Sequence, residues 1–432
     1  MKYYSTNNKA LKVDLKEAVF KGLARDGGLY MPERFPRMED LFLSRLKYLS
    51  LQDIAFEISK ALFSEDVPPG ILEEISRDAV NFEAPVVPVA NGIHCLELFH
   101  GPTLAFKDFG ARYMARLLSW LVKDYNKEIH ILVATSGDTG SAVANGFFGV
   151  EGIKVHVLYP SGKVSDIQEM QFTTLGGNIS ALEIDGNFDD CQRLVKTAFS
   201  DRELEPFITL SSANSINLAR LLPQSFYYWN AWKEMGQLEN VVFCVPSGNF
   251  GNLTAALIAK RMGLNSRHFI TATNVNDIVP VYLETGVFSP RPSVQTLANA
   301  MDVGNPSNFA RMLDLYGHSK EKMAEEISAF SYTDEEIRSA IRRVYPETGY
   351  ILDPHGATGY LASEAYLEKN PGIKVVFLET AHPVKFRETV EPEIQKTLDI
   401  PGRLAKFMGK EKLSTALSSN YEEFREYLLS NR

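Results

Sequence analysis

Residues 128–140 read Glu-Ile-His-Ile-Leu-Val-Ala-Thr-Ser-Gly-Asp-Thr-Gly. The run from Glu128 to Ala134 is mostly apolar and rich in β-branched residues, which predicts a buried strand. The polar residues after it predict a loop that leads into a helix beginning near Ser141. Further strands are expected at 153–159, 178–184, 207–210, 241–245, 268–272 and 374–378. Strands that alternate with helical segments in this way are typical of an α/β fold, in which helices cover both faces of parallel sheets.

The rest of the chain divides into regions of different pattern. A helix is predicted at 108–124, where apolar residues recur at helical spacing. Residues 1–93 read mainly as helices, at Leu11–Arg25, Leu41–Phe63 and Gly70–Asn81. At about 150 residues per domain, a chain of 432 residues suggests two or three domains. We expect a mainly helical N-terminal region at 1–93, a smaller and mobile α/β domain at 94–235, and a second α/β domain at 236–432.

Charge and cysteine content narrow the kinds of partner. The chain has 45 Lys and Arg against 54 Asp and Glu, a formal net charge of −9, and contains no block of five Lys or Arg. This balance argues against nucleic acids and anionic membranes as partners and favours small molecules. The cysteines, Cys95, Cys191 and Cys244, lie far apart among apolar neighbours, as reduced thiols in a reducing compartment do.

The sequence also bears on location and assembly. No signal-peptide pattern follows Met1, and no apolar run reaches about 18 residues, the length needed to span a membrane. We therefore expect a cytoplasmic protein without a membrane span. The sequence leaves open whether the chain is a monomer or a homodimer.

The first of five segments that could carry chemistry is His100-Gly-Pro-Thr-Leu-Ala-Phe-Lys-Asp-Phe-Gly110, directly before the helix at 108–124. A lysine at a helix start is most often solvated, because the positive end of the helix dipole repels it. The same repulsion, with Phe106 and Phe109 alongside, would favour the neutral, nucleophilic amine that a Schiff-base lysine needs. Lys107 is thus either a surface residue or a nucleophile.

Two loops after predicted strands are candidate anion sites. In Ala134-Thr-Ser-Gly-Asp-Thr-Gly140, hydroxyls and backbone N–H groups could bind a carboxylate or could simply cap the helix. In Pro246-Ser-Gly-Asn-Phe-Gly-Asn252, two glycines three residues apart could let the backbone surround a phosphate or could form a structural turn. Neither loop is a dinucleotide fingerprint, and the chain contains no P-loop pattern for nucleotides.

Two more segments are polar and follow predicted strands. The run from Ser211 to Arg220 precedes a helix and could bind a second anion or cap that helix. In Leu378-Glu-Thr-Ala-His-Pro-Val-Lys385, the Thr380 hydroxyl could meet a ligand nitrogen or a strand-end carbonyl. Four other polar residues could join a site or be structural: His100, Asp108, Lys163 and His355. The histidine and cysteine spacing contains no zinc pattern, and no G-x-S-x-G elbow occurs, so we expect neither a metal site nor a hydrolase triad.

Taken together and in their order along the chain, the five segments closely resemble those of the threonine synthase family, which belongs to the fold type II (tryptophan synthase β-chain) superfamily of pyridoxal-phosphate-dependent enzymes. The motifs that carry the resemblance are His-Gly-Pro-Thr-Leu-Ala-Phe-Lys-Asp-Phe-Gly, Ala-Thr-Ser-Gly-Asp-Thr-Gly, Asn-Ser-Ile-Asn, Pro-Ser-Gly-Asn-Phe-Gly and Glu-Thr-Ala-His-Pro. It extends from Gly22-Leu-Ala-Arg-Asp-Gly-Gly-Leu-Tyr-Met-Pro32 to about residue 400. The resemblance implies two open parallel or mixed sheets flanked by helices, with pyridoxal 5′-phosphate as cofactor.

The resemblance also implies a role for each segment. Lys107 would hold the cofactor covalently and later move protons as general acid and base. Thr380 would hydrogen-bond the pyridine nitrogen, and Asp138 stands where many relatives carry an asparagine that contacts the 3′-oxygen of the cofactor. The cofactor phosphate would be bound by Gly248, Asn249, Phe250, Gly251 and Asn252. The substrate carboxylate would be held by Thr135, Ser136, Gly137 and Thr139, and the substrate phosphate by Asn214, Ser215, Asn217 and Arg220.

The reaction implied by the resemblance is the last step of threonine biosynthesis. This lyase converts O-phospho-L-homoserine and water to L-threonine and phosphate by γ-elimination and β-addition. Because several steps exchange protons at one face, we expect the smaller domain to close over the site and exclude water.

Three kinds of alternative function compete with this one, and the first would share nearly all of these residues. A related phospholyase would release a 2-oxo acid and ammonia from the same or a similar phosphoamino acid, and no motif separates it from the synthase. A serine/threonine dehydratase or a cysteine synthase is disfavoured because the lysine motif differs from theirs. A non-catalytic small-molecule sensor is disfavoured because the lysine and both phosphate-type loops are retained.

Overall fold

The computed structural model describes residues 1–123, 128–204 and 206–432 and divides into two compact units. Unit 1 comprises Met1, Met31–Phe106 and Leu221–Asp399. Unit 2 comprises Lys2–Tyr30, Lys107–Arg220 and Ile400–Arg432. Each unit therefore combines stretches of chain that lie far apart in the sequence, and each takes residues from more than one of the expected domains.

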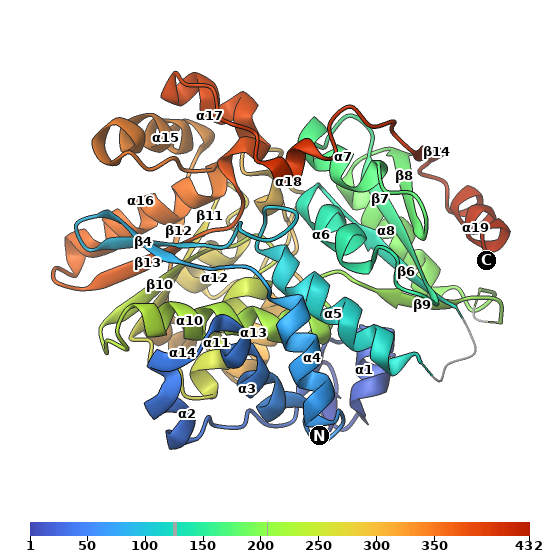
Figure 1. The fold of residues 1–432 in the computed structure, drawn as a ribbon, viewed down its shortest axis with the longest axis horizontal. Coiled ribbons are helices and arrows are strands. Elements are labelled where there is room, and N and C mark those ends of the chain that lie inside the picture. The colour runs from blue at the N-terminus through green and yellow to red at the C-terminus, as the bar shows by residue number, and fades with distance from the viewer. Residues whose placement is uncertain (124–127, 205) are drawn as a thin grey trace. The chain divides into compact units, whose positions relative to one another are not determined.

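Unit 1 is built on a six-stranded mixed sheet in the order β12-β11-β10-β13-β5-β4 (Figure 1). Five strands run parallel, and β4 pairs antiparallel with β5 at one edge. The strands are β4 (Val86–Ala90), β5 (Ile93–Glu97), β10 (Val241–Pro246), β11 (His268–Thr273), β12 (Ile327–Ser331) and β13 (Lys374–Glu379). The apolar strand β10 lies between β11 and β13 and is buried along its whole length, as its continuous apolar sequence predicts.

Helices of unit 1 pack on this sheet, and α16 (Pro354–Lys369) crosses β10, β11 and β13 (Figure 1). Asp353 begins α16 as its N-cap, because its carboxylate accepts the N–H groups of His355 and Gly356. The other helices are α2 (Asp40–Arg45), α3 (Leu51–Phe63), α4 (Pro69–Ala79), α10 (Phe226–Glu234), α11 (Gly251–Arg261), α12 (Ile278–Thr285), α13 (Phe309–Leu315), α14 (Lys320–Glu326), α15 (Asp334–Thr348) and α17 (Arg387–Ile394). The 3-10 helices are η1 (Leu46–Tyr48), η2 (Leu222–Ser225), η3 (Asn299–Met301) and η4 (Pro383–Phe386).

Unit 2 contains a parallel five-stranded sheet in the order β14-β8-β7-β6-β9. Its strands are β6 (Ile129–Ala134), β7 (Ile153–Pro160), β8 (Ile179–Asp185), β9 (Thr209–Ser212) and β14 (Ser414–Ser418). Its helices are α1 (Leu15–Lys21), α5 (Lys107–Leu121), α6 (Asp138–Phe147), α7 (Asp166–Thr173), α8 (Phe188–Ser200), α18 (Gly402–Ala405) and α19 (Tyr421–Ser430), and the short helix α9 (Leu218–Leu221) lies at its end. Helices α5 and α6 pack on each other, and α8 packs on β6 and β7.

The predicted α/β fold with parallel or mixed sheets is confirmed. The helix expected at 108–124 is α5, which begins at Lys107, and residue 124 lies outside the described residues. The helix expected near Ser141 begins earlier, at Asp138, so Asp138 and Thr139 belong to its first turn. No helix in the described ranges is both long enough and apolar enough to cross a membrane.

The start of the chain differs in detail from the predicted helices. The helix expected over Leu11–Arg25 is only α1, because the Asp14 carboxylate caps its start and Gly22, at φ +64°, ends it. The helix expected over Leu41–Phe63 is broken into α2, η1 and α3, because Ser50 and Asp53 form a capping box that starts α3 anew. Three short strands also form here, namely β1 (Tyr3–Ser5), β2 (Lys12–Val13) and β3 (Tyr30–Pro32).

Candidate active site

Lys107 is the first residue of α5, as its motif predicts, and it is half-buried. The segment before it forms an antiparallel bridge, Ala105 to Ala381, with the end of β13. Phe106 donates its N–H to the carbonyl oxygen of Thr380 at 2.9 Å, and His382 donates its N–H to Leu104 at 3.0 Å. The chain therefore enters α5 from a segment that is hydrogen-bonded to the residues around Thr380.

Thr380 directly follows β13 and is buried, with 6 % of its surface exposed. Its carbonyl oxygen is used by Phe106. Its hydroxyl makes no hydrogen bond to another described residue. A neutral hydroxyl of this kind can donate to, or accept from, a ligand nitrogen.

The loop from Gly248 to Asn252 joins β10 to α11 and is tightly packed. A Cβ atom on Gly248 would lie 2.4 Å from the carbonyl oxygen of Ala300 and 2.7 Å from the Cα of Met301, so only glycine fits. Phe250, buried and at φ +60°, is the N-cap residue of α11, and its side chain makes no capping hydrogen bond. A buried helix start without a side-chain cap presents its first N–H groups to an anion.

The asparagine side chains of this loop bond to protein atoms. The Asn252 amide donates to Pro246 at 2.7 Å and accepts the N–H of Leu253 at 3.0 Å. The Asn249 side-chain oxygen accepts the N–H of Ser307 at 2.6 Å. These contacts hold the loop in shape, so its backbone is the part suited to bind an anion.

The loop between β6 and α6 is held by Thr135. Its hydroxyl accepts the N–H groups of Gly137 and Gly140, at 2.9 and 2.8 Å, and donates to the carbonyl of Gly137 at 3.1 Å. Ser136 and Thr139 are half-buried, and their hydroxyls bond to no other residue in the described part of the chain. Thr135 therefore shapes the loop, while Ser136 and Thr139 can face a ligand.

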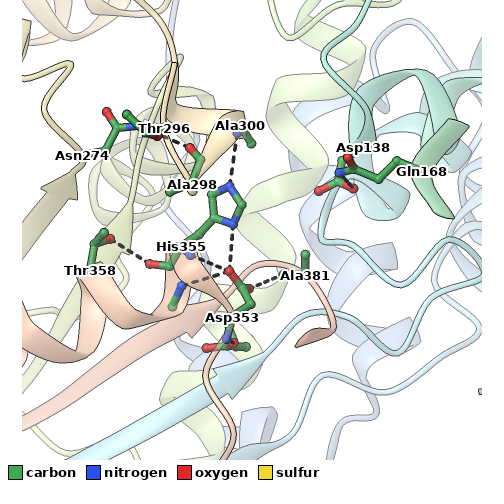
Figure 2. A network of polar contacts seen from close by, with 12 residues as sticks. Asp138, Gln168, Asn274, Thr296, Ala298, Ala300, Asp353, His355, Thr358 and Ala381 are labelled. Carbon is green, nitrogen blue, oxygen red and sulfur yellow. Dashed lines mark hydrogen bonds and ion pairs between the residues drawn. The ribbon is translucent and has the colours of Figure 1, made fainter. Parts of the chain in front are cut away.

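Asp138 lies in the first turn of α6 and is buried, with its carboxylate accepting a hydrogen bond from the Gln168 amide at 2.8 Å (Figure 2). Gln168 lies in α7 and is fully buried. A Cβ on Gly137, at φ +139°, would lie 2.4 Å from the Gln168 side-chain oxygen. Gln168 was not predicted from the sequence, where only the cap residue Ser165 marks the start of its helix.

The segment from Ser211 to Arg220 is internal. Asn217 is fully buried, and its amide donates to Val19 at 2.8 Å and Ser212 at 3.0 Å while accepting the N–H of Ala219 at 3.0 Å. The Asn214 amide donates to the carbonyl of Ala134 at 3.0 Å, and Ser215 is half-buried.

Arg220 is also buried and donates to Ala213 at 2.6 Å. Burial lowers the pKa of Arg220 to about 10, and the nearby Asp108 opposes that shift. Such a cation keeps its charge at neutral pH.

Replacing Asn217 with alanine should destabilise the protein, because the substitution leaves three buried backbone groups without their partner. We expect a loss of about 2–3 kcal/mol in the free energy of unfolding. Urea denaturation measures this loss in the free energy of unfolding. The control is Asn240→Ala, which alters an exposed asparagine. An unfolding midpoint equal to that of the wild type would contradict this structural role.

The remaining polar candidates are placed as follows. His100 pairs with the Glu97 carboxylate at 2.8 Å, Asp108 is buried in the first turn of α5, and Lys163 is exposed. His355 is buried and bonds to Asp353, a partner that was not predicted from the sequence (Figure 2). Among the described residues, no three His, Cys, Asp or Glu side chains group in a way that could hold a metal ion.

Family models match almost the whole chain. The model described as "Pyridoxal-phosphate dependent enzyme" matches residues 84–395. The model described as "Threonine synthase N terminus" matches residues 2–80.

Curated proteins and solved structures agree with these models. Threonine synthase of Escherichia coli (strain K12) is 43 % identical over 434 residues, covering 100 % of both chains, and its crystal structure matches with a TM-score of 0.93. The structure of pyridoxal-phosphate-bound threonine synthase from Brucella melitensis matches with a TM-score of 0.92 and 35 % identity, covering 100 % of this chain and 99 % of that one. The predicted fold type II architecture and pyridoxal-phosphate dependence are confirmed, and the chain belongs to the threonine synthase family.

Proposed function

We propose that this chain converts O-phospho-L-homoserine and water to L-threonine and phosphate, as a pyridoxal-phosphate-dependent lyase. The observation that carries the proposal is the likeness to a threonine synthase over the whole chain, at 43 % identity. The position of Lys107 supports it, because a candidate Schiff-base lysine directly follows a segment bonded to Thr380.

The residues present suit the cofactor. The glycine at 248 and the start of α11, where Phe250 offers no capping side chain, suit a phosphate group, so we assign the cofactor phosphate to Gly248–Asn252. Thr380 would bond to the pyridine nitrogen through its hydroxyl, and Lys107 would form the covalent bond. Asp138, held by Gln168, would lie beside the cofactor ring.

Substrate recognition uses two further anion sites. We assign the substrate carboxylate to the loop that contains Thr135, Ser136, Gly137 and Thr139, with the Ser136 and Thr139 hydroxyls as direct donors. The substrate phosphate is assigned to the segment with Asn214, Ser215, Asn217 and Arg220. Because Asn217 makes three internal hydrogen bonds, it would act there by holding the segment.

The chain's own residues then carry the proton transfers. When bound, pyridoxal phosphate supplies an electron sink for the charge that develops on the substrate. The substrate amine would replace the Lys107 amine, which would then take the proton from the α-carbon, and loss of a β-proton would allow the γ-phosphate to leave. Protonation of the γ-carbon, addition of the hydroxyl of water at the β-carbon and return of a proton to the α-carbon would complete threonine, and Lys107 would release it by taking back its own place.

The product identifies the reaction. Purified protein with pyridoxal phosphate is incubated with O-phospho-L-homoserine, and the products are separated by chromatography and identified by mass spectrometry. Threonine with an equal amount of phosphate supports the synthase. The formation of 2-oxobutanoate with ammonia would instead identify the phospholyase, and unchanged substrate would overturn the proposed substrate.

Replacing Ser136 with alanine, or Thr139 with valine, should weaken the binding of the substrate carboxylate. Each change removes one hydroxyl donor to a charged group, so we expect KM to rise about tenfold, with a smaller change in kcat. Steady-state kinetics with O-phospho-L-homoserine measures both constants. Ser161→Ala, at an exposed serine after β7, is the control, and KM values equal to the control's would remove these hydroxyls from the site.

We also propose that the protein is cytoplasmic and binds neither nucleic acid nor membranes, working as a monomer or a homodimer. Its three cysteines are free and buried, which suits a reducing compartment. The expected division at residues 93 and 235, and the closure of the 94–235 domain during turnover, stay predictions.

A further inference from the structure

Three buried polar side chains of unit 1 form a connected network that the reaction does not use directly. Asp353, the N-cap of α16, accepts the N–H of His355 at 2.5 Å and of Gly356 at 3.3 Å on one carboxylate oxygen. Its other oxygen accepts the N–H of Ala381 at 3.2 Å (Figure 2). Asp353 thus holds the backbone of the residue that follows Thr380.

His355 extends the network in the other direction. Its Nδ1 lies 2.7 Å from the Asp353 carboxylate, and its Nε2 lies 3.2 Å from the backbone nitrogen of Ala300. Because a backbone N–H can only donate, Nε2 must be the acceptor and the proton must sit on Nδ1. The hydrogen bonds therefore require the neutral Nδ1–H tautomer of His355.

The segment that His355 holds lies against the proposed phosphate loop. The carbonyl oxygen of Ala300 is the atom closest to the position of a Cβ on Gly248. A chain of contacts therefore runs from Ala381 through Asp353, His355 and Ala300 to Gly248. Its ends adjoin the two places assigned to the pyridine nitrogen and the phosphate of the cofactor.

Glu379 is the third side chain of this network. It is fully buried, and its carboxyl accepts the N–H of Asp353 at 2.5 Å. Burial, and then the negative charge of Asp353, raise the pKa of Glu379 well above its usual range. The backbone N–H groups of His355, Gly356 and Ala381 stabilise the Asp353 carboxylate.

We propose that Asp353 and His355 are positioning residues that fix the distance between the Gly248 loop and Thr380. The reason is chemical: the pyridine nitrogen and the phosphate ester of pyridoxal phosphate are carried by one rigid ring, so both ends bind only when their partners lie at a fixed separation. The inference rests on the proposed cofactor contacts of Gly248 and Thr380.

His355→Asn is the main test, with His355→Gln as the rescue variant. The shorter Asn amide can still donate to Asp353 but cannot reach Ala300, whereas the Gln amide lies closer to the position of Nε2. His268→Asn is the control, because His268 is a half-buried histidine of unit 1 that lies outside this network and contacts Ser328 at 2.9 Å at the start of β11. The apoproteins are first compared by thermal unfolding.

The readout is affinity rather than activity. Dissociation constants are measured by fluorescence titration for pyridoxal phosphate, for pyridoxal and for inorganic phosphate. We expect His355→Asn to weaken the binding of pyridoxal phosphate at least about tenfold, with much smaller losses of affinity for pyridoxal and for inorganic phosphate. We expect His355→Gln to recover most of the lost affinity.

Several outcomes would overturn the inference. One is an affinity of His355→Asn for pyridoxal phosphate that equals the affinity of His268→Asn. Another is a loss of affinity for inorganic phosphate as large as the loss for pyridoxal phosphate, which would mean that the network only shapes the loop. If His355→Asn does not fold, Asp353→Asn, which keeps a capping side chain but removes the charge, is tested by the same titrations with the same expectation. A wild-type protein that binds the cofactor but makes no threonine would reject the proposed function and leave this test intact.

Discussion

Replacing Lys107 with alanine should lower the rate of threonine formation by more than roughly 10⁴-fold. The variant loses the amine that we propose bonds to the cofactor and removes the α-proton. Because the phosphate loop and Thr380 are untouched, pyridoxal phosphate should still bind, without a covalent bond. Turnover is measured by product formation, and the covalent bond by borohydride reduction followed by mass spectrometry of the peptide that contains residue 107.

The control for this prediction is Lys196→Ala, which changes an exposed lysine on α8. Its turnover and its reduced, cofactor-labelled peptide at Lys107 should match those of the wild type. A Lys107→Ala variant that retains turnover within about tenfold of the control, or a label on another lysine in the wild type, would show that Lys107 has been assigned wrongly.

Replacing Gly248 with alanine should weaken the binding of pyridoxal phosphate by roughly 10- to 100-fold. The added Cβ would lie 2.4 Å from the oxygen of Ala300 and 2.7 Å from the Cα of Met301, and both are backbone atoms that cannot rotate away. The loop must therefore shift, and the N–H groups proposed to hold the phosphate shift with it. Fluorescence titration of the apoprotein measures the dissociation constant.

Gly70→Ala is the matched control, because Gly70 lies in α4 and has no atom within 4 Å of its Cβ position. It should leave cofactor affinity unchanged and stabilise the protein slightly, by about 0.5–1 kcal/mol. If Gly248→Ala bound the cofactor as tightly as this control, the close packing at Gly248 would have no role in the site.

The central strands could be predicted from the sequence because burial on both faces leaves a continuous apolar run. Strands β6, β7, β10 and β13 carry such runs and appear within one or two residues of their predicted ends. The edge strands β12 and β14 have no such run, since Ile327–Ser331 and Ser414–Ser418 each bury only one residue fully. Their pairing depends on long-range contacts, which local sequence does not encode.

The positions of the loops proposed for the site could also be predicted, because their sequence signals are local: a lysine at a helix start, and glycines and hydroxyls after strands. Their partners could not. Gln168 reaches Asp138 from 30 positions away, and His355 reaches Ala300 from 55. The structural role of Asn217 depends on Val19, 198 positions earlier. A polar residue facing a ligand and one facing a distant backbone group look the same in a sequence.

The order of synthesis affects how the sheet of unit 2 can be completed. The edge strand of this sheet is β14, which pairs with β8 from Ser414 opposite Ala181 to Ser418 opposite Asp185. Phe424 and Leu428 of α19 complete the apolar cluster that contains Leu182 and Leu194. During synthesis on the ribosome, the edge of β8 therefore stays unpaired until β14 has been made, which is more than two hundred residues later in the chain. A chain released before residue 400 would keep that edge and those apolar side chains exposed, and would be prone to aggregate and open to proteases.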